Sequence, residues 1–354
     1  MPYLTDPEEL TTLLDGEPDY RADQLRAWLY TTPVLSTDEM TNLSLPLRDS
    51  LRDRLWPFQV ESMQTADDGT TIKWLFRSPD GVAMESVLMG YRKRVTLCIS
   101  SQAGCALACS FCATGQFGFD RQLEAGEIYA QVAYATAHLR SHPIPGSPDH
   151  ITNIVYMGMG EPLANYTRVR ESLRRIIDVR GLAARSVTVS TVGVVPGMLK
   201  LAEEPWQVKL AVSLHAADDE LRSQLVPLNR RYPLAMVESA AATYFAAKGR
   251  RVSIEWTLID SVNDTLEQAR KLAPIAERLQ AHVNVIALNP TPLSIQRPSR
   301  PDRIEAFMAE LDRQGVNCTL RNTRGQDIDA ACGQLRARQE PKRRLAPLTI
   351  STTD

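Results

Sequence analysis

The hydrophobic and polar positions of the chain follow a regular alternation from about residue 94 onward. Apolar runs of five to eight residues recur between longer segments whose apolar residues lie three and four positions apart. The short runs predict buried strands, and the longer spacing predicts amphipathic helices. The predicted strands span 94–99, 151–157, 186–191, 208–214, 252–259, 283–288 and 316–320. The predicted helices lie near 124–140, 166–179, 197–204, 234–248, 265–279 and 301–314.

This alternation of strands and helices predicts a parallel sheet with helices packed outside it. About six strand–helix units follow one another without an obvious reversal of strand order. We therefore predict an α/β fold, a partial (βα)6 barrel similar to a TIM barrel, in preference to a flat doubly wound sheet. In either fold, ligands bind at the carboxyl ends of the strands. The loops that follow the strands are therefore the places to search for chemistry.

Two different patterns precede the barrel. Leu25, Trp28 and Leu29 have helical spacing, and leucines recur every four residues between 43 and 55. Apolar and polar residues alternate between 62 and 88, where the turn at Pro79-Asp80-Gly81 predicts a hairpin or small sheet. The chain is therefore divided into a small helical N-terminal domain at 1–60, a small β extension at 61–92, a barrel at 93–322, a segment at 323–335 and a disordered basic tail at 336–354.

The composition excludes several classes of protein. Of the 354 residues, 44% are hydrophobic and 23% are charged, which is ordinary for a globular protein and excludes fibrous and wholly disordered chains. The first ten residues carry three acids and no base, unlike a secretory signal, and no long uncharged apolar run suggests a membrane span. We therefore expect a soluble, cytoplasmic protein whose six cysteines stay reduced.

Charge is unevenly distributed along the chain. The first 40 residues hold nine acids and two bases, a balance of −7, so with a total of −2 the remaining residues sum to +5. Basic clusters suit a phosphate backbone, although solvated arginines on helix faces explain any single pair equally well. The clusters are Arg92-Lys93-Arg94, Arg174-Arg175, Arg230-Arg231, Arg250-Arg251, Arg297 with Arg300 and Arg303, and Lys342-Arg343-Arg344.

Three cysteines lie within eight residues, just after the first predicted barrel strand. They form a C-x3-C-x2-C pattern at Cys105, Cys109 and Cys112. Three thiolates this close repel one another unless a metal ion or cluster binds them. Structural zinc prefers four closed ligands, and no fourth cysteine or histidine lies nearby in the sequence. Three ligands to a four-iron cluster leave one iron open to chelate a small molecule and pass it an electron.

The cysteine pattern, with Phe111 before the third cysteine, resembles the signature of the radical S-adenosylmethionine superfamily. A more specific resemblance, to the radical adenine-carbon-2 methyltransferases of ribosomal and transfer RNA, covers nearly the whole chain. It rests on the runs C-A-L-A-C-S-F-C-A-T-G-Q-F-G-F, Y-M-G-M-G-E-P-L-A-N, V-S-T-V-G, S-L-H-A, R-G-Q-D-I-D-A-A-C-G-Q-L and, near the N-terminus, R-A-D-Q-x-x-x-W-L-Y. The resemblance implies a radical S-adenosylmethionine barrel with one 4Fe–4S cluster on the three cysteines. It also implies that each turnover uses S-adenosylmethionine twice.

The resemblance assigns the cofactor site to residues at strand ends. The positions that it implies are Gly160, Glu161, Ser190, Ser213, Leu214, His215 and Asn289. A glycine lets the backbone approach a ligand, and a carboxylate accepts hydrogen bonds from an ammonium group or a ribose. Taken alone, a strand-end serine or asparagine is more often a helix cap or turn former.

Three further residues carry the reaction that the resemblance implies. Cys332 is at the position of the methyl-carrying cysteine, and Glu85 is at that of the proton acceptor. Cys98 is at the position of the cysteine that resolves a covalent protein–RNA intermediate through a transient disulfide with Cys332. By sequence alone, Cys98 is typical of a core residue and Glu85 of an exposed strand residue. Cys318 lies outside every motif and is interpreted as structural.

The resemblance implies a dual-specificity enzyme that forms 2-methyladenine in the peptidyl transferase loop of 23S rRNA and beside the anticodon of tRNA. Residues 1–60 are then an accessory RNA-binding domain and residues 323–335 the catalytic cysteine segment. We expect a monomer that receives electrons from a donor such as flavodoxin or ferredoxin and does not bind membranes. Two alternatives stay open. One is methylation of adenine carbon 8 in rRNA, which confers ribosomal antibiotic resistance, and the other is a non-catalytic, metal-stabilised RNA-binding scaffold.

Overall fold

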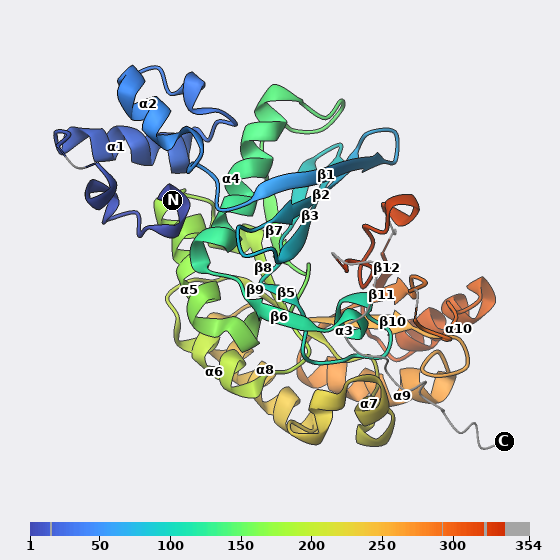
Figure 1. Cartoon of the computed structure of the whole chain (residues 1–354). Helices are drawn as coiled ribbons and strands as arrows, with labels where there is room; N and C mark the ends of the chain where they lie inside the picture. The colour runs from blue at the N-terminus through green and yellow to red at the C-terminus, as the bar shows by residue number, and fades with distance from the viewer. Residues whose placement is uncertain (15, 292, 322–323, 337–354) are drawn as a thin grey trace.

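A single sheet runs through the computed structural model, which describes residues 1–336 except 15, 292 and 322–323 (Figure 1). The strand order among the described residues is β1-β2-β3-β4-β7-β8-β9-β10-β11-β12, and β5 pairs separately with β6. Helices are arranged around this sheet (Figure 1). The tail predicted to be disordered at 336–354 lies outside the described residues, apart from Arg336.

The predicted parallel barrel is confirmed. Each neighbouring pair of strands from β4 to β12 in the main sheet is parallel, so the carboxyl ends of these strands lie at one end of the barrel. Every strand agrees within two residues with its predicted start and end. The strands are β4 (Arg94–Cys98), β7 (Asn153–Tyr156), β8 (Val187–Thr191), β9 (Lys209–Ser213), β10 (Ser253–Leu258), β11 (His282–Ala287) and β12 (Cys318–Leu320).

The predicted helices between these strands are also present. They are α4 (Ala125–Ser141), α5 (Tyr166–Arg174) with its continuation η6 (Arg175–Val179), α6 (Val195–Glu203), α8 (Leu234–Lys248), α9 (Leu266–Arg278) and α10 (Pro301–Arg313). The sequence pattern misses α3 (Ala113–Phe117), which is buried on all sides, and α7 (Asp219–Leu225), because neither has a long apolar stripe. Among the described helices, none combines the length and the apolar character needed to cross a bilayer.

The N-terminal helices dock on the outside of the barrel through aromatic rings. They include α1 (Tyr20–Arg26) and α2 (Leu45–Arg52), within the helical region that the leucine spacing predicts. The ring of Tyr30 stacks on Tyr129 of α4 with centroids 4.6 Å apart, and the ring of Trp56 meets Tyr134 of α4 edge-on at 5.3 Å. Aromatic pairs stabilise beyond their buried area, so these contacts fix the helical domain against α4.

Acidic residues of the N-terminal segment pair with the barrel. Arg174 contacts Asp6 at 2.8 Å and Glu8 at 3.1 Å, and Arg175 Nη1 donates to the Tyr3 carbonyl at 2.7 Å. In the sequence, Arg174-Arg175 is one of the basic clusters that suit a phosphate backbone. The structure corrects that interpretation, because both side chains are already engaged in holding the N-terminal segment to the barrel.

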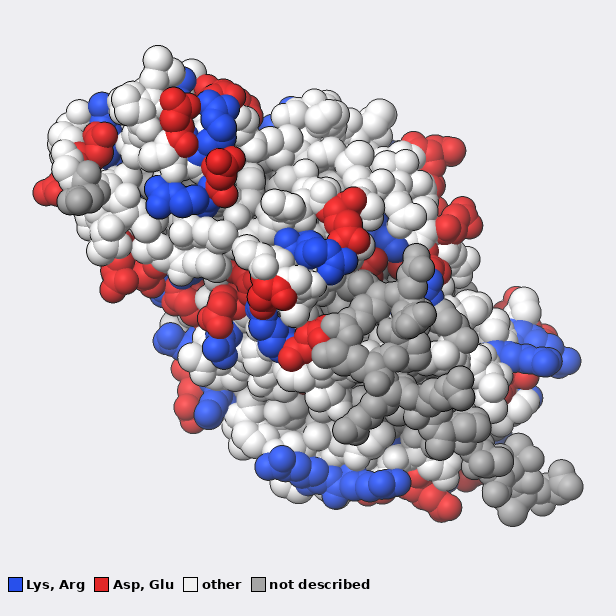
Figure 2. All heavy atoms as spheres, in the orientation of Figure 1, with Lys and Arg blue, Asp and Glu red and all other residues white. Residues whose placement is uncertain are grey.

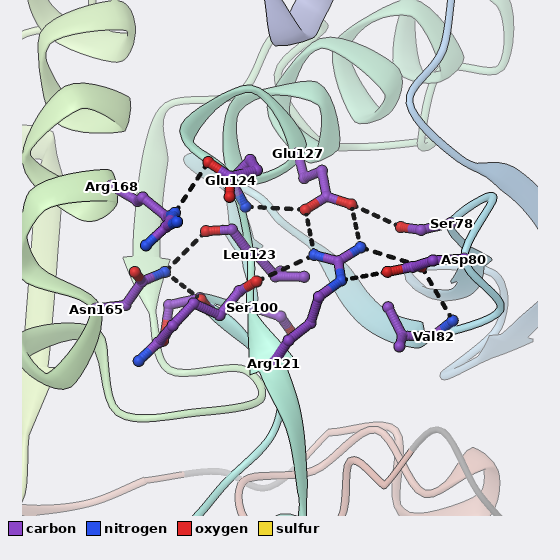
Figure 3. A network of polar contacts seen from close by, with 12 residues as sticks. Ser78, Asp80, Val82, Ser100, Arg121, Leu123, Glu124, Glu127, Asn165 and Arg168 are labelled. Atoms are coloured by element: carbon purple, nitrogen blue, oxygen red, sulfur yellow. Dashed lines mark hydrogen bonds and ion pairs between the residues drawn. The ribbon is translucent and has the colours of Figure 1, made fainter.

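Strands β1 (Gln59–Ala66), β2 (Thr71–Arg77) and β3 (Ala83–Tyr91) extend the barrel sheet as an antiparallel meander. Figure 3 shows how the turn between β2 and β3 is held. Arg121 pairs with Asp80 of that turn and with Glu127 of α4, and Ser78 Oγ donates to Glu127 at 2.7 Å. Arg121 belongs to β6 (Phe119–Gln122), which pairs with β5 (Gln102–Gly104), so the meander is fixed beside the cysteine turn.

The docking of the N-terminal domain predicts an unequal cost for two arginine substitutions. Arg175→Met leaves the Tyr3 carbonyl without its buried donor, so unfolding free energy should fall by roughly 1–3 kcal/mol. Arg168→Met, the matched control, removes a half-exposed pair with Glu124 and should cost less than about 1 kcal/mol. Urea unfolding of both variants measures the difference, and equal losses contradict this role for Arg175.

Candidate active site

The three cysteines lie on a partly buried turn between β5 and α3, in which Cys109 is buried and Cys105 and Cys112 are half-buried. Gly104 begins the turn at φ +78, and a Cβ there would lie 2.1 Å from the carbonyl oxygen of Gly118. The Cys105 amide donates to that same carbonyl at 2.8 Å. The turn then packs against apolar residues that follow β9, β10 and β11, including Ala216, Ile259 and Leu288. The cysteines therefore lie at the carboxyl ends of the barrel strands.

The electrostatics of this turn favour a bound cationic group. Burial raises the pKa of Cys105 to about 12 and raises that of Cys109 well above its usual value, and the neighbouring thiols add to both shifts. Thiolates form here only when positive charge compensates them. Among the described residues, no three His, Cys, Asp or Glu side chains are gathered closely enough to hold a single metal ion. Three cysteine thiolates are the donor set of a four-iron cluster with one open iron.

A first cavity of about 940 Å³, open solvent included, adjoins the cysteine turn. Six of the seven predicted cofactor positions line it together with the three cysteines: Gly160, Glu161, Ser190, Ser213, His215 and Asn289. Leu214 is the exception. Its side chain lies in the hydrophobic core, and its backbone amide donates to the Glu255 carbonyl at 3.1 Å.

Gly160 and Glu161 form a rigid ledge in the first cavity. Gly160 has φ +98, and a Cβ there would lie 2.4 Å from the Cβ of Gln102. The carboxylate of Glu161 accepts from the amides of Leu163 at 3.0 Å and Val192 at 2.9 Å. Burial nevertheless raises the pKa of Glu161 to about 7. This ledge therefore provides a buried acceptor suited to an ammonium or hydroxyl donor.

His215 is held as a neutral ring behind the cysteine turn. Its Nδ1 accepts from the Thr257 amide at 3.0 Å, and its ring meets Phe111 edge-on at 4.5 Å. Burial and the nearby charge of Arg222 lower the pKa of His215 to about 3. The sequence analysis misses Arg222, which is 1% exposed and donates to the Asn229 amide oxygen and to backbone carbonyls of the neighbouring loops. Only its tertiary surroundings distinguish it from a surface arginine of α7.

Cys332 lies where the first cavity meets a second cavity deeper in the barrel. It lines both. The segment that carries it is held by the Asn289 side chain, which donates to the Cys332 carbonyl at 3.0 Å, and by the Ala113 amide, which donates to Gly333 at 2.7 Å. Cys98 lines only the second cavity. Burial raises the pKa of Cys98, and the neighbouring Cys332 raises it further. The two cysteines, far apart in sequence, therefore share one cavity.

Glu85 is not among the residues that line either cavity. It is 5% exposed on β3, pairs with Lys73 at 3.3 Å and accepts from the Arg336 amide at 2.8 Å. By sequence alone Glu85 is typical of an exposed strand residue, whereas the structure buries its side chain. The contact with Arg336 joins Glu85 to the segment that follows Cys332.

Two charged residues in the barrel were not expected from the sequence. Arg321 and Glu255 pair at 3.2 Å, and Asn284 donates to the same carboxylate at 2.9 Å. Both charged residues line the first cavity, and Arg321 also lines the second. A glutamate within the apolar strand β10 is a signal that sequence reading could have used. Arg321 follows β12 without any motif, so only the fold reveals it.

Comparisons with known proteins agree with this geometry. The radical SAM superfamily matches residues 99–273, and the N-terminal domain of ribosomal RNA large subunit methyltransferases matches residues 6–56. A probable dual-specificity RNA methyltransferase RlmN of Streptomyces griseus is 47% identical over 91% of this chain and 89% of its own length. The counterpart of Thermobifida fusca is 48% identical over 91% and 90%. The chain belongs to the RlmN family.

A solved relative has the same fold. The crystal structure of a radical SAM methyltransferase from Sphaerobacter thermophilus has a TM-score of 0.89 and 46% identity, covering 95% of this chain and 99% of that one. As a radical SAM member of the RlmN family, the chain uses a 4Fe–4S cluster and S-adenosylmethionine. The cysteine turn has the donor set for the cluster, and the first cavity adjoins it.

The ledge predicts that Gly160→Ala impairs cofactor binding. The added Cβ must displace Gln102, whose side chain accepts from the Glu161 amide, and strain of about 1–3 kcal/mol corresponds to a loss of roughly 5- to 150-fold in affinity. Gly146→Ala is a matched control, because Gly146 also has positive φ but open space around it. Equilibrium binding of S-adenosylmethionine to the reconstituted proteins measures both. Equal affinities for the two variants contradict the proposed contact.

Proposed function

We propose that this chain is a dual-specificity RNA methyltransferase that forms 2-methyladenine in 23S rRNA and tRNA, with Cys332 as the methyl carrier. The observation that carries the proposal is the position of Cys332, which lines both the cavity beside the cysteine turn and the cavity that holds Cys98. The similarity to RlmN proteins over nine-tenths of the chain supports the substrate assignment.

The chemistry of the target explains why a protein sulfur is needed. Carbon 2 of adenine lies between two ring nitrogens and is electron-poor, so it does not attack a sulfonium methyl directly. Cys332 Sγ accepts the methyl first, in an ordinary displacement that needs the thiolate. Burial raises the pKa of Cys332, and the positive charge of Arg321 opposes that shift. When bound, the cluster and S-adenosylmethionine would supply the radical that removes a hydrogen atom from the methyl group carried by this sulfur.

Cys98 releases the product in this proposal. As the Cys98 thiol loses its proton and its sulfur bonds to Cys332, the carbon–sulfur bond to RNA breaks. Its electron pair goes to the methylene carbon, which takes up a proton and becomes the methyl group, leaving a disulfide that an external thiol reductant reopens. The shared second cavity supports this pairing. Glu85 accepts the ring proton, and its bond from Arg336 keeps it beside the segment that carries Cys332.

The same proposal covers the partners and the domains. An electron donor of the flavodoxin or ferredoxin kind reduces the cluster, and the enzyme acts as a monomer in the cytoplasm, where its RNA substrates are. Residues 1–60 form an accessory RNA-binding domain, residues 61–92 a β extension, residues 93–322 the barrel and residues 323–335 the catalytic segment. The family match over residues 6–56 supports the first of these assignments.

Removal of the methyl carrier tests the proposal. Cys332→Ala should abolish methyl transfer to RNA while iron and sulfide contents stay unchanged, because Cys332 is not one of the three cysteines of the turn. Cys318→Ala is the control, since Cys318 lies on β12 with its thiol 3.7 Å from a backbone carbonyl of α10. Mass spectrometry of the RNA measures the product and locates its methyl group. A product at carbon 8, or continued turnover by Cys332→Ala, overturns the proposal.

Removal of the resolving cysteine should instead trap an intermediate. With Cys98→Ala, the thioether between Cys332 and RNA forms but cannot be cleaved by a neighbouring thiol, so a covalent protein–RNA adduct should accumulate. Denaturing electrophoresis with labelled RNA detects it. The double variant with Cys332→Ala should give no adduct. Recovery of only unmodified protein after turnover of the single variant argues against Cys98 as the resolving residue.

A further inference from the structure

The second cavity opens at the end of the barrel opposite the cysteine turn. Its lining includes the first or second residue of four parallel strands: Arg94 of β4, Asn153 of β7, Thr188 of β8 and Lys209 of β9. Arg94 and Lys209 are exposed, so the cavity reaches the surface here. We call these four residues the amino-terminal mouth of the barrel. The cavity measures about 1120 Å³, open solvent included.

Two basic hollows flank the amino-terminal mouth. One is formed by Tyr91 and the adjoining residues 92–94, and it shares Arg94 with the mouth. The other is formed largely by residues 248–251 and shares Lys209 with the mouth. Each hollow therefore places several cations immediately beside the opening of the second cavity.

These cations are not neutralised within the part of the chain that the structure describes. Arg92, Lys93, Arg94, Lys209 and the pair at 250–251 form no ion pair with a described carboxylate, whereas other arginines of the barrel do. Figure 2 shows that on one face of the molecule many blue cations lie next to red carboxylates. An unneutralised basic rim around a cavity is an electrostatic site for a polyanion.

The guanidinium groups at the mouth are also held close together. Arg94 and Arg324 both stack on the ring of Tyr91, with distances of 4.3 and 4.2 Å to its centroid. Arg324 is fixed further by donating to the Gly90 carbonyl at 2.8 Å. Two like charges on one ring repel each other, and an anion bound between or beside them relieves that repulsion.

We propose that RNA docks on the amino-terminal mouth, where the target adenine enters the second cavity and the flanking cations bind the phosphates on either side of it. This inference rests on the proposed function. The base then approaches Cys332 and Cys98 from the end of the barrel opposite the cofactor, which explains why Cys98 lines only the second cavity. An adenine in a loop, already weakly stacked, can be turned out of its strand into such a cavity at low cost.

An acidic electron-transfer protein is a less suitable occupant of this surface. Its redox group must approach the cluster, and the cysteine turn lies at the other end of the barrel strands. An extruded base, in contrast, can fill a cavity that runs inward from the rim. The geometry therefore favours RNA.

The test compares variants in which two cations at one end of the barrel or the other are replaced by neutral glutamines. Arg94→Gln with Lys209→Gln alters the mouth, and Arg92→Gln with Lys93→Gln alters only the exposed hairpin beside it. Arg230→Gln with Arg231→Gln is the control, because these exposed residues precede α8 and follow the carboxyl end of β9. Fluorescence anisotropy with an anticodon stem-loop RNA gives the affinity of each variant over a series of salt concentrations. Binding of S-adenosylmethionine verifies that each variant is folded.

The mouth variant and the hairpin variant should each bind RNA at least about tenfold more weakly, and the slope of log affinity against log salt should fall by roughly 1 to 2, since each lost phosphate contact removes slightly less than one unit. The control should match the unaltered protein. Equal affinities for all proteins, or equal losses in the control, overturn the docking site. So does unchanged RNA binding with slower reduction by an acidic flavoprotein. RNA binding does not depend on catalysis. If the unaltered enzyme binds RNA but forms no 2-methyladenine in it, the proposed function is refuted and the docking site is not.

Discussion

The attachment of one C-terminal segment across the barrel is the constraint on which the active site depends. Helix α3 follows Cys112 directly, and its first two residues bind this segment: the Ala113 amide donates to Gly333 at 2.7 Å and Thr114 Oγ1 donates to Leu335 at 2.5 Å. The same short helix therefore positions the cysteine turn and Cys332. Because these bonds are made to backbone carbonyls, the position of Cys332 depends on the path of the segment and only weakly on its side chains.

The two ends of the barrel differ in the charges that line them. In the first cavity the carboxylate of Glu255 is paired with Arg321, and the carboxylate of Glu161 accepts from backbone amides, which suits a cofactor that carries an ammonium group. Exposed cations, including Arg94 and Lys209, surround the opening of the second cavity, which suits a polyanion. Cys332 lies between them. In the proposed reaction, the methyl donor and the RNA would therefore reach Cys332 from different cavities.

The arginines of the chain divide according to what they touch. Arg121 and Arg175 are engaged by carboxylates and carbonyls and hold elements of the fold together, and the buried Arg222 braces the loops behind the cysteine turn. Arg94 at the mouth and Arg92 beside it form no ion pair with a carboxylate among the described residues. Because a buried arginine must satisfy its donors, burial and pairing distinguish the two groups where sequence clusters do not. The acidic start of the chain is explained in the same way, since Asp6 and Glu8 pair with Arg174.

The sequence by itself determined the strands and most helices, because burial of one face imposes a period on each element. It also determined the cysteine turn and the Gly160-Glu161 ledge, because their residues are contiguous. It could not determine α3 or α7, which lack that period, nor the roles of Arg222, Glu255 and Arg321, which depend on neighbours far away in the chain. Only the tertiary structure decided that Cys98 and Cys332 share a cavity and that Arg174 and Arg175 serve the N-terminal domain. Such contacts follow from how the strands assemble, and no local pattern of residues encodes them.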